Sequence, residues 1–344
     1  MRVLQVDAGR EWRGGQNQVR LLTRELARIP GLDVQLLTKR GSQLARRAAE
    51  AGVSVSGVPW GPGLDPRAWW QLRSCIRRFR PDIVHVHDSH ALTLARAAAS
   101  AATVIAHRRV DFHIRPRSTW FRARAIIAVS RAVQQVLVAD GIPPARITVI
   151  PDGIDPDEAR GAAARRLDIR GRLGLSAATP LAVNVAALVD HKDQRTLVRA
   201  AAHARAARPD LHWVIAGEGE LRRALERDIA DQGVGDRVHL VGYVPEADAL
   251  IREATVVVMS SKEEGMGSVI LDALALEKPV VATAAGGIPE VLPPDRLVPV
   301  GDATALGAMV VAAITHPPSP LPLASKFTAK SMANATLALY HSLV

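Results

Sequence analysis

Short apolar runs alternate with longer amphipathic stretches along nearly the whole chain, and this alternation predicts strands and helices in turn. The apolar runs predict strands at residues 2–6, 33–37, 83–86, 103–106, 125–128, 148–150, 181–185, 212–216, 238–241, 256–259, 280–282 and 297–298. The stretches between them predict helices at residues 16–28, 43–51, 66–78, 91–101, 131–139, 194–206, 220–231, 246–253, 268–276 and 305–315. Because strand–helix alternation with continuously apolar strands is typical of parallel sheets, we expect an α/β protein with two doubly wound, Rossmann-like domains.

The division between the two domains is predicted at a polar, Gly- and Ala-rich segment, residues 154–174, which has no strand pattern. We therefore expect one domain at residues 1–165 and a second at residues 166–326. The length of 344 residues agrees, since one core rarely grows that large. After a proline cluster, residues 327–344 predict a final helix with Met332, Ala335, Leu339 and Leu343 on its apolar side.

Charge is distributed unequally between these halves. Residues 1–165 hold 26 basic and 14 acidic side chains, a net charge of +12, whereas residues 166–344 hold 18 and 20, a net charge of −2. The first half should therefore meet an anionic partner: a nucleic acid, a phosphorylated small molecule or an anionic membrane surface. Arginine outnumbers lysine 38 to 6, so the base composition of the gene can account for part of this excess. Nucleic acid is disfavoured because the chain has twelve aromatic residues and no nucleic-acid-binding motif.

The environment of the protein is indicated by its cysteine content and its apolar segments. Cys75 is the single cysteine, which excludes an internal disulfide and favours a reducing, cytoplasmic compartment. Asp7 interrupts the first apolar run, so we expect a strand there and not a signal peptide. The uncharged stretch 303–325 is broken by prolines and is too short to span a bilayer.

Three loops that follow predicted strands contain glycines or a lysine suited to a phosphate. Gly14 and Gly15 precede the first helix, where backbone N–H groups can approach an anion, although the spacing is not G-x-G-x-x-G. Lys192 follows the first strand of the second domain, and Gly217 and Gly219 follow the next. Taken alone, the Gly14-Gly15 pair is as often a turn as an anion site, whereas Lys192 by itself favours a solvated loop lysine and Gly217 with Gly219 favours a structural turn.

The fourth loop, residues 260–273, is the most specific. Gly265 and Gly267 leave backbone N–H groups free at a helix start, and Glu264 stands at the carboxyl edge of the sheet. Asp272 follows eight residues after Glu264 and shares a helix face with Ser268. Acceptor groups on both sides of an N–H cradle suit a ligand with hydroxyls flanking a diphosphate, such as a sugar nucleotide.

The ordered set of these segments resembles the GT-B glycosyltransferases of retaining family 4 over essentially the whole chain. The segments that carry the resemblance are Gly14-Gly15, residues 126–130 (IIAVS), residues 150–155 (IPDGID), Lys192, Gly217-Glu218-Gly219, residues 241–244 (VGYV), Glu264 to Asp272, and residues 286–290 (GGIPE). The resemblance implies a hexosyltransferase-type enzyme with the sugar nucleotide on the second domain and the acceptor on the first, facing a cleft. It also implies that the final helix crosses back to the first domain.

Roles for individual residues follow from the resemblance. Glu264 would bind donor-sugar hydroxyls, Lys192 would neutralise the diphosphate and Asp272 would bind the ribose. The backbone N–H groups of Gly265, Met266, Gly267, Ser268 and Val269 would hold the sugar and diphosphate; Tyr243 and Val244 would line the base pocket, and Gly15 would touch the diphosphate from the other domain. No protein nucleophile is required, and no cofactor is expected.

Two positions depart from the family pattern. Ala187 stands where the family has an arginine on the diphosphate, and Asp272 replaces the usual glutamate. A first-domain histidine at a strand end is expected to act as a general acid or polarising group, and His107 fits best, with His113 and His87 as alternatives. A sugar-nucleotide 2-epimerase and a non-catalytic binding protein of the same fold are the alternative functions.

The sequence does not predict a metal site. His85 and His87 share one face of a strand, but no third ligand is evident near them in the sequence, so we expect no metal. The Asp155-Pro156-Asp157 triplet lies in the segment between the domains and not after a sheet strand, so it is not expected to bind one either.

Residues 66–80 predict an amphipathic helix with Trp69, Leu72, Ile76 and Phe79 on one side and Trp70 beside them. Arginines lie off that stripe, so the helix could rest on an anionic bilayer surface; the alternative is that the stripe packs on the sheet. With the basic first half, this favours peripheral attachment to the inner leaflet of the membrane and an anionic or lipid-linked acceptor from lipopolysaccharide or exopolysaccharide synthesis.

Overall fold

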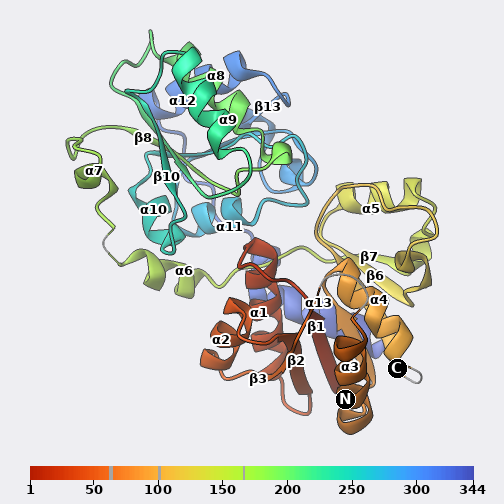
Figure 1. Ribbon diagram of the computed structural model, residues 1–344. Helices are drawn as coiled ribbons and strands as arrows, with labels where there is room; N and C mark the ends of the chain where they lie inside the picture. Colours follow the sequence, from red (N-terminus) through yellow and green to blue (C-terminus); the bar gives the residue numbers. More distant parts are fainter. Residues whose placement is uncertain (62–64, 100–101, 166) are drawn as a thin grey trace. The chain divides into compact units, whose positions relative to one another are not determined.

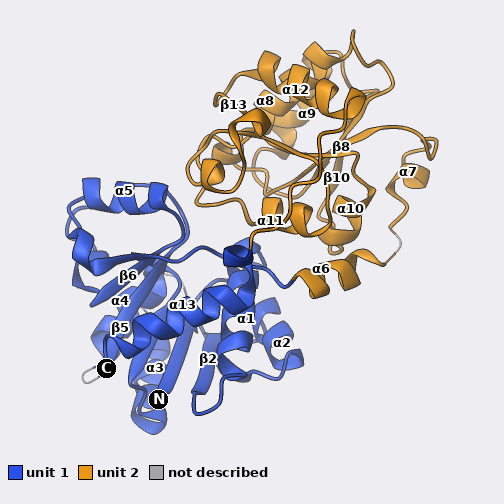
Figure 2. Ribbon diagram, turned by 180° about the vertical axis from the view of Figure 1, so that it is seen from behind, with its two compact units in different colours: residues 1–155, 325–344 blue, residues 156–324 orange. Residues whose placement is uncertain are grey.

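The chain folds into two compact units. The computed structural model describes residues 1–61, 65–99, 102–165 and 167–344. The first unit comprises Met1–Asp155 together with Ser325–Val344, and the second comprises Pro156–Ala324 (Figure 2). The division thus falls ten residues before the predicted 165/166 boundary, because helix α6 (Pro156–Ala163) packs against α10 (Ala247–Glu253) and α11 (Ser268–Ala275) of the second unit.

The first unit is built on a seven-stranded parallel sheet with the order β3-β2-β1-β4-β5-β6-β7 (Figure 1). Its strands are β1 (Arg2–Asp7), β2 (Asp33–Lys39), β3 (Ser54–Val58), β4 (Ile83–Val86), β5 (Thr103–Arg108), β6 (Ala125–Ala128) and β7 (Ile147–Val149). Its helices are α1 (Gly14–Ala27), α2 (Gln43–Glu50), α3 (Pro66–Phe79), α4 (Ser89–Ala98), α5 (Arg131–Ala139) and α13 (Ala329–His341).

The second unit has a six-stranded parallel sheet with the order β10-β9-β8-β11-β12-β13. Its strands are β8 (Leu181–Val185), β9 (His212–Ala216), β10 (Val238–Gly242), β11 (Val256–Met259), β12 (Val280–Thr283) and β13 (Leu297–Val298). Besides α6, α10 and α11, its helices are α7 (Ile169–Arg172), α8 (Gln194–Ala204), α9 (Arg222–Asp231) and α12 (Ala303–Thr315).

The predicted fold class is confirmed, since each unit is a doubly wound parallel sheet covered by helices. All twelve predicted strands are present within a few residues, and β3 is an additional edge strand. The predicted end of the helix at residues 91–101 lies outside the described residues. The segment 154–174 was predicted to lack strands, and the structure adds the short helices α6 and α7 there.

Helix α13 packs in the first unit, against α1. The chain enters it beside Gly153, where a Cβ atom would lie 2.3 Å from the carbonyl oxygen of Thr328, so only glycine allows this approach. The predicted apolar side of the helix is partly wrong. Met332 is buried as expected, but Ala335 is exposed and Tyr340 is fully buried. The helix therefore places a phenol beneath the sheet.

Helix α3 packs its apolar stripe inside the first unit, as in the second of the two predicted alternatives. Leu72 and Ile76 are buried, whereas Trp70 remains 65% exposed. The guanidinium of Arg73 stacks over the ring of Trp69 at 5.5 Å. The buried stripe of α3 therefore cannot contact a bilayer. The side chains of Trp70 and of neighbouring arginines remain accessible to one. Among the described residues, no helix combines the length and apolarity needed to cross a membrane.

Candidate functional site

Two of the three charged residues predicted for the donor meet at the carboxyl edge of the second sheet. Lys192 follows β8 and Glu264 follows β11, and these adjacent strands are where the strand order reverses. Crevices outside such a reversal are the usual ligand sites of open α/β sheets. The ammonium of Lys192 is ion-paired with the Oε2 atom of Glu264. A role was predicted for each of these residues, but the contact between them was not.

Neighbouring polar groups hold the Glu264 loop in place. The hydroxyl of Ser261 donates to Oε2 of Glu264 at 3.2 Å, and the backbone N–H of Gly287 donates to the Glu264 carbonyl at 2.9 Å. The hydroxyl of Ser260 donates to the Lys192 carbonyl at 3.0 Å. The loops after β8, β11 and β12 are therefore joined, and the carboxylate has a fixed position.

The predicted N–H cradle lies at the start of α11. Gly267 has a φ of 82°, a left-handed conformation that glycine adopts without strain, and it immediately precedes the first helical residue, Ser268. Gly265 and Met266 are buried, and Ser268 and Val269 are partly buried. The first N–H groups of a helix have no intrahelical acceptor, so this turn can bind an anion.

Asp272 lies in α11 near two other carboxylates. Burial, together with the negative charges of Asp248 and Glu158, raises the pKa of Asp272 well above its usual value. A carboxyl group with this pKa is a ready hydrogen-bonding partner for a hydroxyl, as the predicted ribose role requires. An ionised carboxylate at this position would therefore destabilise the folded state.

The loops after β8, β9 and β10 are hydrogen-bonded side by side. The N–H of Gly217 donates to the Gly242 carbonyl at 2.8 Å, and the N–H of Leu188 donates to the Glu218 carbonyl at 3.0 Å. A Cβ atom at Gly217 would lie 1.9 Å from the carbonyl oxygen of Ala186, so the glycine is needed for close backbone contact. Ala187 lies in this same group of loops, where its carbonyl accepts from the side chain of Gln194.

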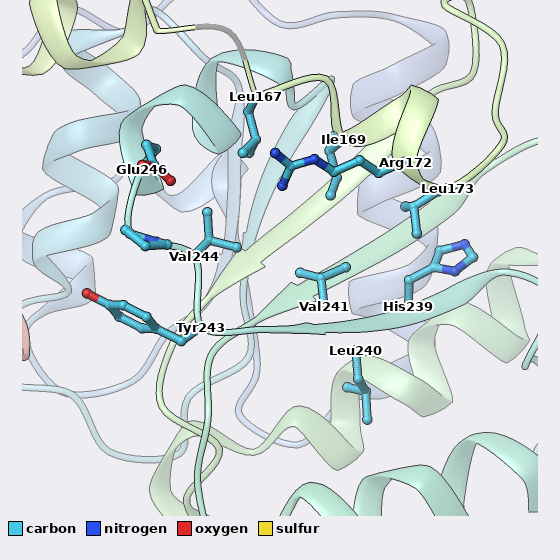
Figure 3. A pocket seen from close by; sticks show the side chains of 11 residues that line it. Leu167, Ile169, Arg172, Leu173, His239, Leu240, Val241, Tyr243, Val244 and Glu246 are labelled. Atoms are coloured by element: carbon cyan, nitrogen blue, oxygen red, sulfur yellow. The ribbon is translucent and has the colours of Figure 1, made fainter.

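Tyr243 and Val244 border a cavity of about 440 Å³ on the flank of the edge strand β10. Figure 3 shows the cavity between β10 and the segment that contains α7, with Leu167, Ile169 and Arg172 on the side opposite the strand. Tyr243 is 48% exposed. Both residues assigned to the base pocket therefore line a cavity. The cavity is also lined by the α7 segment, which was not predicted as part of the site.

The first unit has its own strand reversal between β1 and β4. Asp7 ends β1, and its carboxylate accepts from the N–H of Gly9 at 2.9 Å. Burial and the charge of Asp88 raise the pKa of Asp7 to about 6, against the opposing effects of the Gly9 N–H and of Arg109. Gly15 lies in the first turn of α1, where a Cβ would meet no atom within 4 Å. Asp7 was not predicted as a site residue.

Three histidines gather beside this reversal, which corrects the argument against a metal. His85 pairs with Ile105 in the β4–β5 register, so His107, two residues later, falls beside His87 on the same face. Ligand atoms of the three imidazoles lie within 4.8 Å of one another. A third potential ligand is therefore present, and the sequence spacing hid it because it comes from the neighbouring strand.

Arg109 contacts two of these histidines and was missed in the sequence. Its guanidinium donates to His87, to His107 and to the carboxylate of Asp152. His107 is 1% exposed, whereas the Arg109 side chain is 11% exposed. The alternative His113 lies apart from the cluster, with its ring on the carboxylate of Asp140 at 2.6 Å. The structure thus brings together His107 and His87 but not His113.

Comparison with known families identifies the family of the chain. Residues 12–158 match the family described as Glycosyltransferase Family 4, and residues 166–328 match the family described as Glycosyl transferases group 1. The two matches cover both units, and the chain belongs to these glycosyltransferases and has the GT-B fold.

Curated relatives have related names. A 2-deoxystreptamine glucosyltransferase of Streptomyces kanamyceticus is 28% identical over 63% of this chain and 64% of its own length. A protein of Bacillus subtilis with the name "Putative glycosyltransferase EpsD" is 27% identical over 70% of this chain and 69% of its own length. A lipopolysaccharide core biosynthesis glycosyltransferase, LpsE of Rhizobium meliloti, is 32% identical over 34% of each chain.

Solved structures agree in fold. Anabaena HepE, crystallised in complex with UDP-glucose, superposes with a TM-score of 0.84 over 99% of this chain and 100% of its own, at 18% identity. At that identity the likeness establishes the fold alone.

Proposed function

We propose that this glycosyltransferase moves a sugar from a nucleoside-diphosphate-sugar donor to a cell-envelope acceptor, with retention of configuration at the anomeric carbon. The observation that carries the proposal is the Lys192–Glu264 ion pair at the strand reversal, next to the N–H cradle of α11. A cation, a carboxylate and free backbone N–H groups are the three kinds of partner that a sugar diphosphate needs. The UDP-glucose bound to Anabaena HepE supports this class of donor.

In the proposed reaction the bond between the anomeric carbon and the diphosphate oxygen breaks, and its electron pair leaves with the diphosphate. The acceptor oxygen bonds to the same face of the anomeric carbon, and its proton passes to the departing phosphate oxygen. The main electrostatic task is to stabilise the leaving diphosphate. Lys192 and the N–H groups at the start of α11 would perform it, while Glu264 orients the sugar hydroxyls.

A cell-envelope acceptor is supported by the names of relatives and by the basic first half of the chain. LpsE is named for lipopolysaccharide core synthesis. The net charge of +12 over residues 1–165 favours an anionic acceptor or an anionic membrane surface. We place the enzyme in the cytoplasm, attached peripherally to the inner leaflet through the exposed side of α3 and its surroundings.

The test is product analysis with a panel of UDP- and GDP-sugars, with and without a lipid-linked or lipopolysaccharide-derived acceptor. Transfer predicts that nucleoside diphosphate is released only with acceptor, and that NMR of the product shows the anomeric configuration of the donor. Inverted product would contradict retention. An epimerised nucleotide sugar formed without acceptor would establish the 2-epimerase instead, and binding without turnover would establish a binding protein.

A further inference from the structure

Arg109 fixes the protonation of two histidines through its hydrogen bonds. Nη1 lies 3.0 Å from Nδ1 of His87, Nη2 lies 3.0 Å from Nδ1 of His107, and Nε donates to Asp152 at 2.9 Å. A guanidinium can only donate hydrogen bonds. Both Nδ1 atoms must therefore accept, and a neutral imidazole that accepts at Nδ1 carries its proton on Nε2.

A second chain of hydrogen bonds leads to the same assignment from the opposite side. Nε2 of His87 lies 2.6 Å from Oε1 of Gln5, as a protonated Nε2 requires. The amide nitrogen of Gln5 donates to the Tyr340 oxygen at 2.9 Å, and donation from the Tyr340 hydroxyl to Nδ1 of His85, at 2.6 Å, gives the phenol proton an acceptor. His85 therefore also carries its proton on Nε2. A single pattern of imidazole protonation is therefore compatible with all of these hydrogen bonds, from Arg109 after β5 to Tyr340 in α13.

The electrostatic surroundings keep these rings neutral. Burial and the charge of Arg109 lower the pKa of His85, His87 and His107 well below the usual value. The opposing carboxylate of Asp152 is already bonded to Arg109. Asp7, itself influenced by Asp88, and the phenol of Tyr340, whose pKa burial raises, also lie near Arg109.

We propose that Arg109 is a positioning residue that holds His107 as a neutral imidazole with its proton on Nε2, so that His107 acts as a fixed N–H donor and not as a base. Nε2 of His107 is buried and has no hydrogen-bond partner among the described residues, so its N–H group can donate to a ligand. His107 is the penultimate residue of β5 and pairs with Ile127 of β6, close to the carboxyl edge of the sheet, where the first unit would bind substrate. The role in transfer rests on the proposed function; the tautomer does not.

The tautomer can be measured without any substrate. In protein labelled with ¹⁵N-histidine, long-range ¹H–¹⁵N correlation spectra between pH 5.5 and 7.5 should show His107 and His87 protonated on Nε2 alone, with no titration. The His107→Gln protein assigns the signal. A proton on Nδ1, or a doubly protonated ring at pH 6, would overturn the proposal even if the protein proves to be an active transferase.

Variants of Arg109 test its part. Arg109→Gln should let His107 exchange between tautomers or titrate, and Arg109→Lys, which can reach one Nδ1 atom at a time, should restore the assignment only partly. Arg46→Gln on the exposed side of α2 is the matched control and should leave the spectra unchanged. An unchanged His107 signal in a folded Arg109→Gln protein would refute the positioning role.

Metal content and enzyme kinetics distinguish this proposal from a zinc site and from a role of Arg109 in substrate binding alone. Elemental analysis of the purified protein should find no zinc held by the three imidazoles, because Arg109 occupies two of their nitrogens; one zinc per chain, lost in His85→Ala, would overturn the assignment. If transfer activity is found, Arg109→Gln should lower kcat about tenfold or more and give it a new pH dependence, with the donor KM nearly unchanged. A loss confined to KM would contradict the positioning role.

Discussion

Lys192 and Glu264 form an ion pair across the strand reversal of the second unit, although 72 positions separate them in the chain. Their side chains are 19% and 11% exposed, so each charge depends on the other in the ligand-free protein. An arriving diphosphate would share the ammonium, and the sugar hydroxyls would share the carboxylate. The ion pair would thus contact both the diphosphate and the sugar of the proposed donor.

Glu264→Gln should lower kcat at least tenfold while leaving the fold intact. The amide cannot give sugar hydroxyls the charged acceptor that the carboxylate offers, and a charged hydrogen bond contributes about 1.5–3 kcal/mol, or roughly 10–100-fold. Steady-state kinetics and circular dichroism check this. Glu263→Gln, at the exposed neighbouring position, is the control and should behave as wild type. Unchanged kinetics in a folded Glu264→Gln protein would remove Glu264 from the site.

Lys192→Ala should weaken binding of a nucleoside diphosphate more than binding of the corresponding nucleoside. The ammonium contacts phosphate in the proposed complex and not the base or ribose, so the diphosphate alone should lose about tenfold or more in affinity. Calorimetric titration of both ligands measures the difference. Lys262→Ala, an exposed lysine paired with Asp190, is the control. Equal losses for the two ligands would contradict the assignment.

Asp272→Asn should stabilise the protein increasingly as the pH rises. Because the pKa of Asp272 is raised in the folded chain, the folded state holds its proton more tightly than the unfolded state, and stability is lost as the pH climbs through the folded pKa. The asparagine avoids that loss, so its Tm advantage should be larger at pH 8 than at pH 5.

The same substitution should weaken nucleoside diphosphate binding about tenfold, because the amide offers the ribose a weaker acceptor. Thermal unfolding at the two pH values and calorimetry provide the measurements. Asp231→Asn, at the exposed end of α9, should change neither property. A Tm difference that is the same at pH 5 and pH 8 would show that Asp272 does not carry the buried charge.

Binding to anionic vesicles should be strong at low salt and lost at high salt. Each basic residue near an anionic leaflet contributes about 1 kcal/mol, and this attraction falls off within a Debye length. Because Leu72 and Ile76 of α3 are buried, Trp70 is the apolar group left to insert, and Trp70→Ala should weaken binding. Co-sedimentation with anionic and neutral liposomes checks both points. No binding to anionic vesicles at low salt would favour a soluble, phosphorylated acceptor.

Most of the fold could be predicted because the central strands are continuous apolar runs. Strand β3 was not predicted because Ser54–Val58 contains two serines and a glycine, and at the sheet edge only Val58 of this strand is buried. In α13, the pattern of aliphatic residues predicted that Ala335 would be buried, but Ala335 is exposed. Tyr340, which was not assigned to the apolar side, is buried, and its hydroxyl is hydrogen-bonded to Gln5 and His85. Hydrophobicity alone does not indicate that a phenol will find buried partners.

Individual residues of the candidate site could be predicted from the sequence, but the contacts between them could not. Glu264 and the glycines after it lie within one loop, so their spacing was sufficient. The contact between Lys192 and Glu264, and that between His87 and His107, depend on which strands are neighbours. Arg109 follows His107 by two positions, and a basic residue at a strand end beside two histidines is the signal that could have indicated it.

Thermal unfolding with nucleotide sugars tests the proposed donor site most directly. A ligand that binds only the folded state at about 100 times its Kd adds about 2.7 kcal/mol of stability, which corresponds to a Tm increase of about 5–10 °C for a unit of this size. We predict such a shift with at least one of UDP-glucose, UDP-N-acetylglucosamine and GDP-mannose, and a much smaller shift in Lys192→Ala. No shift with any nucleoside diphosphate or its sugars at millimolar concentration would contradict the donor site.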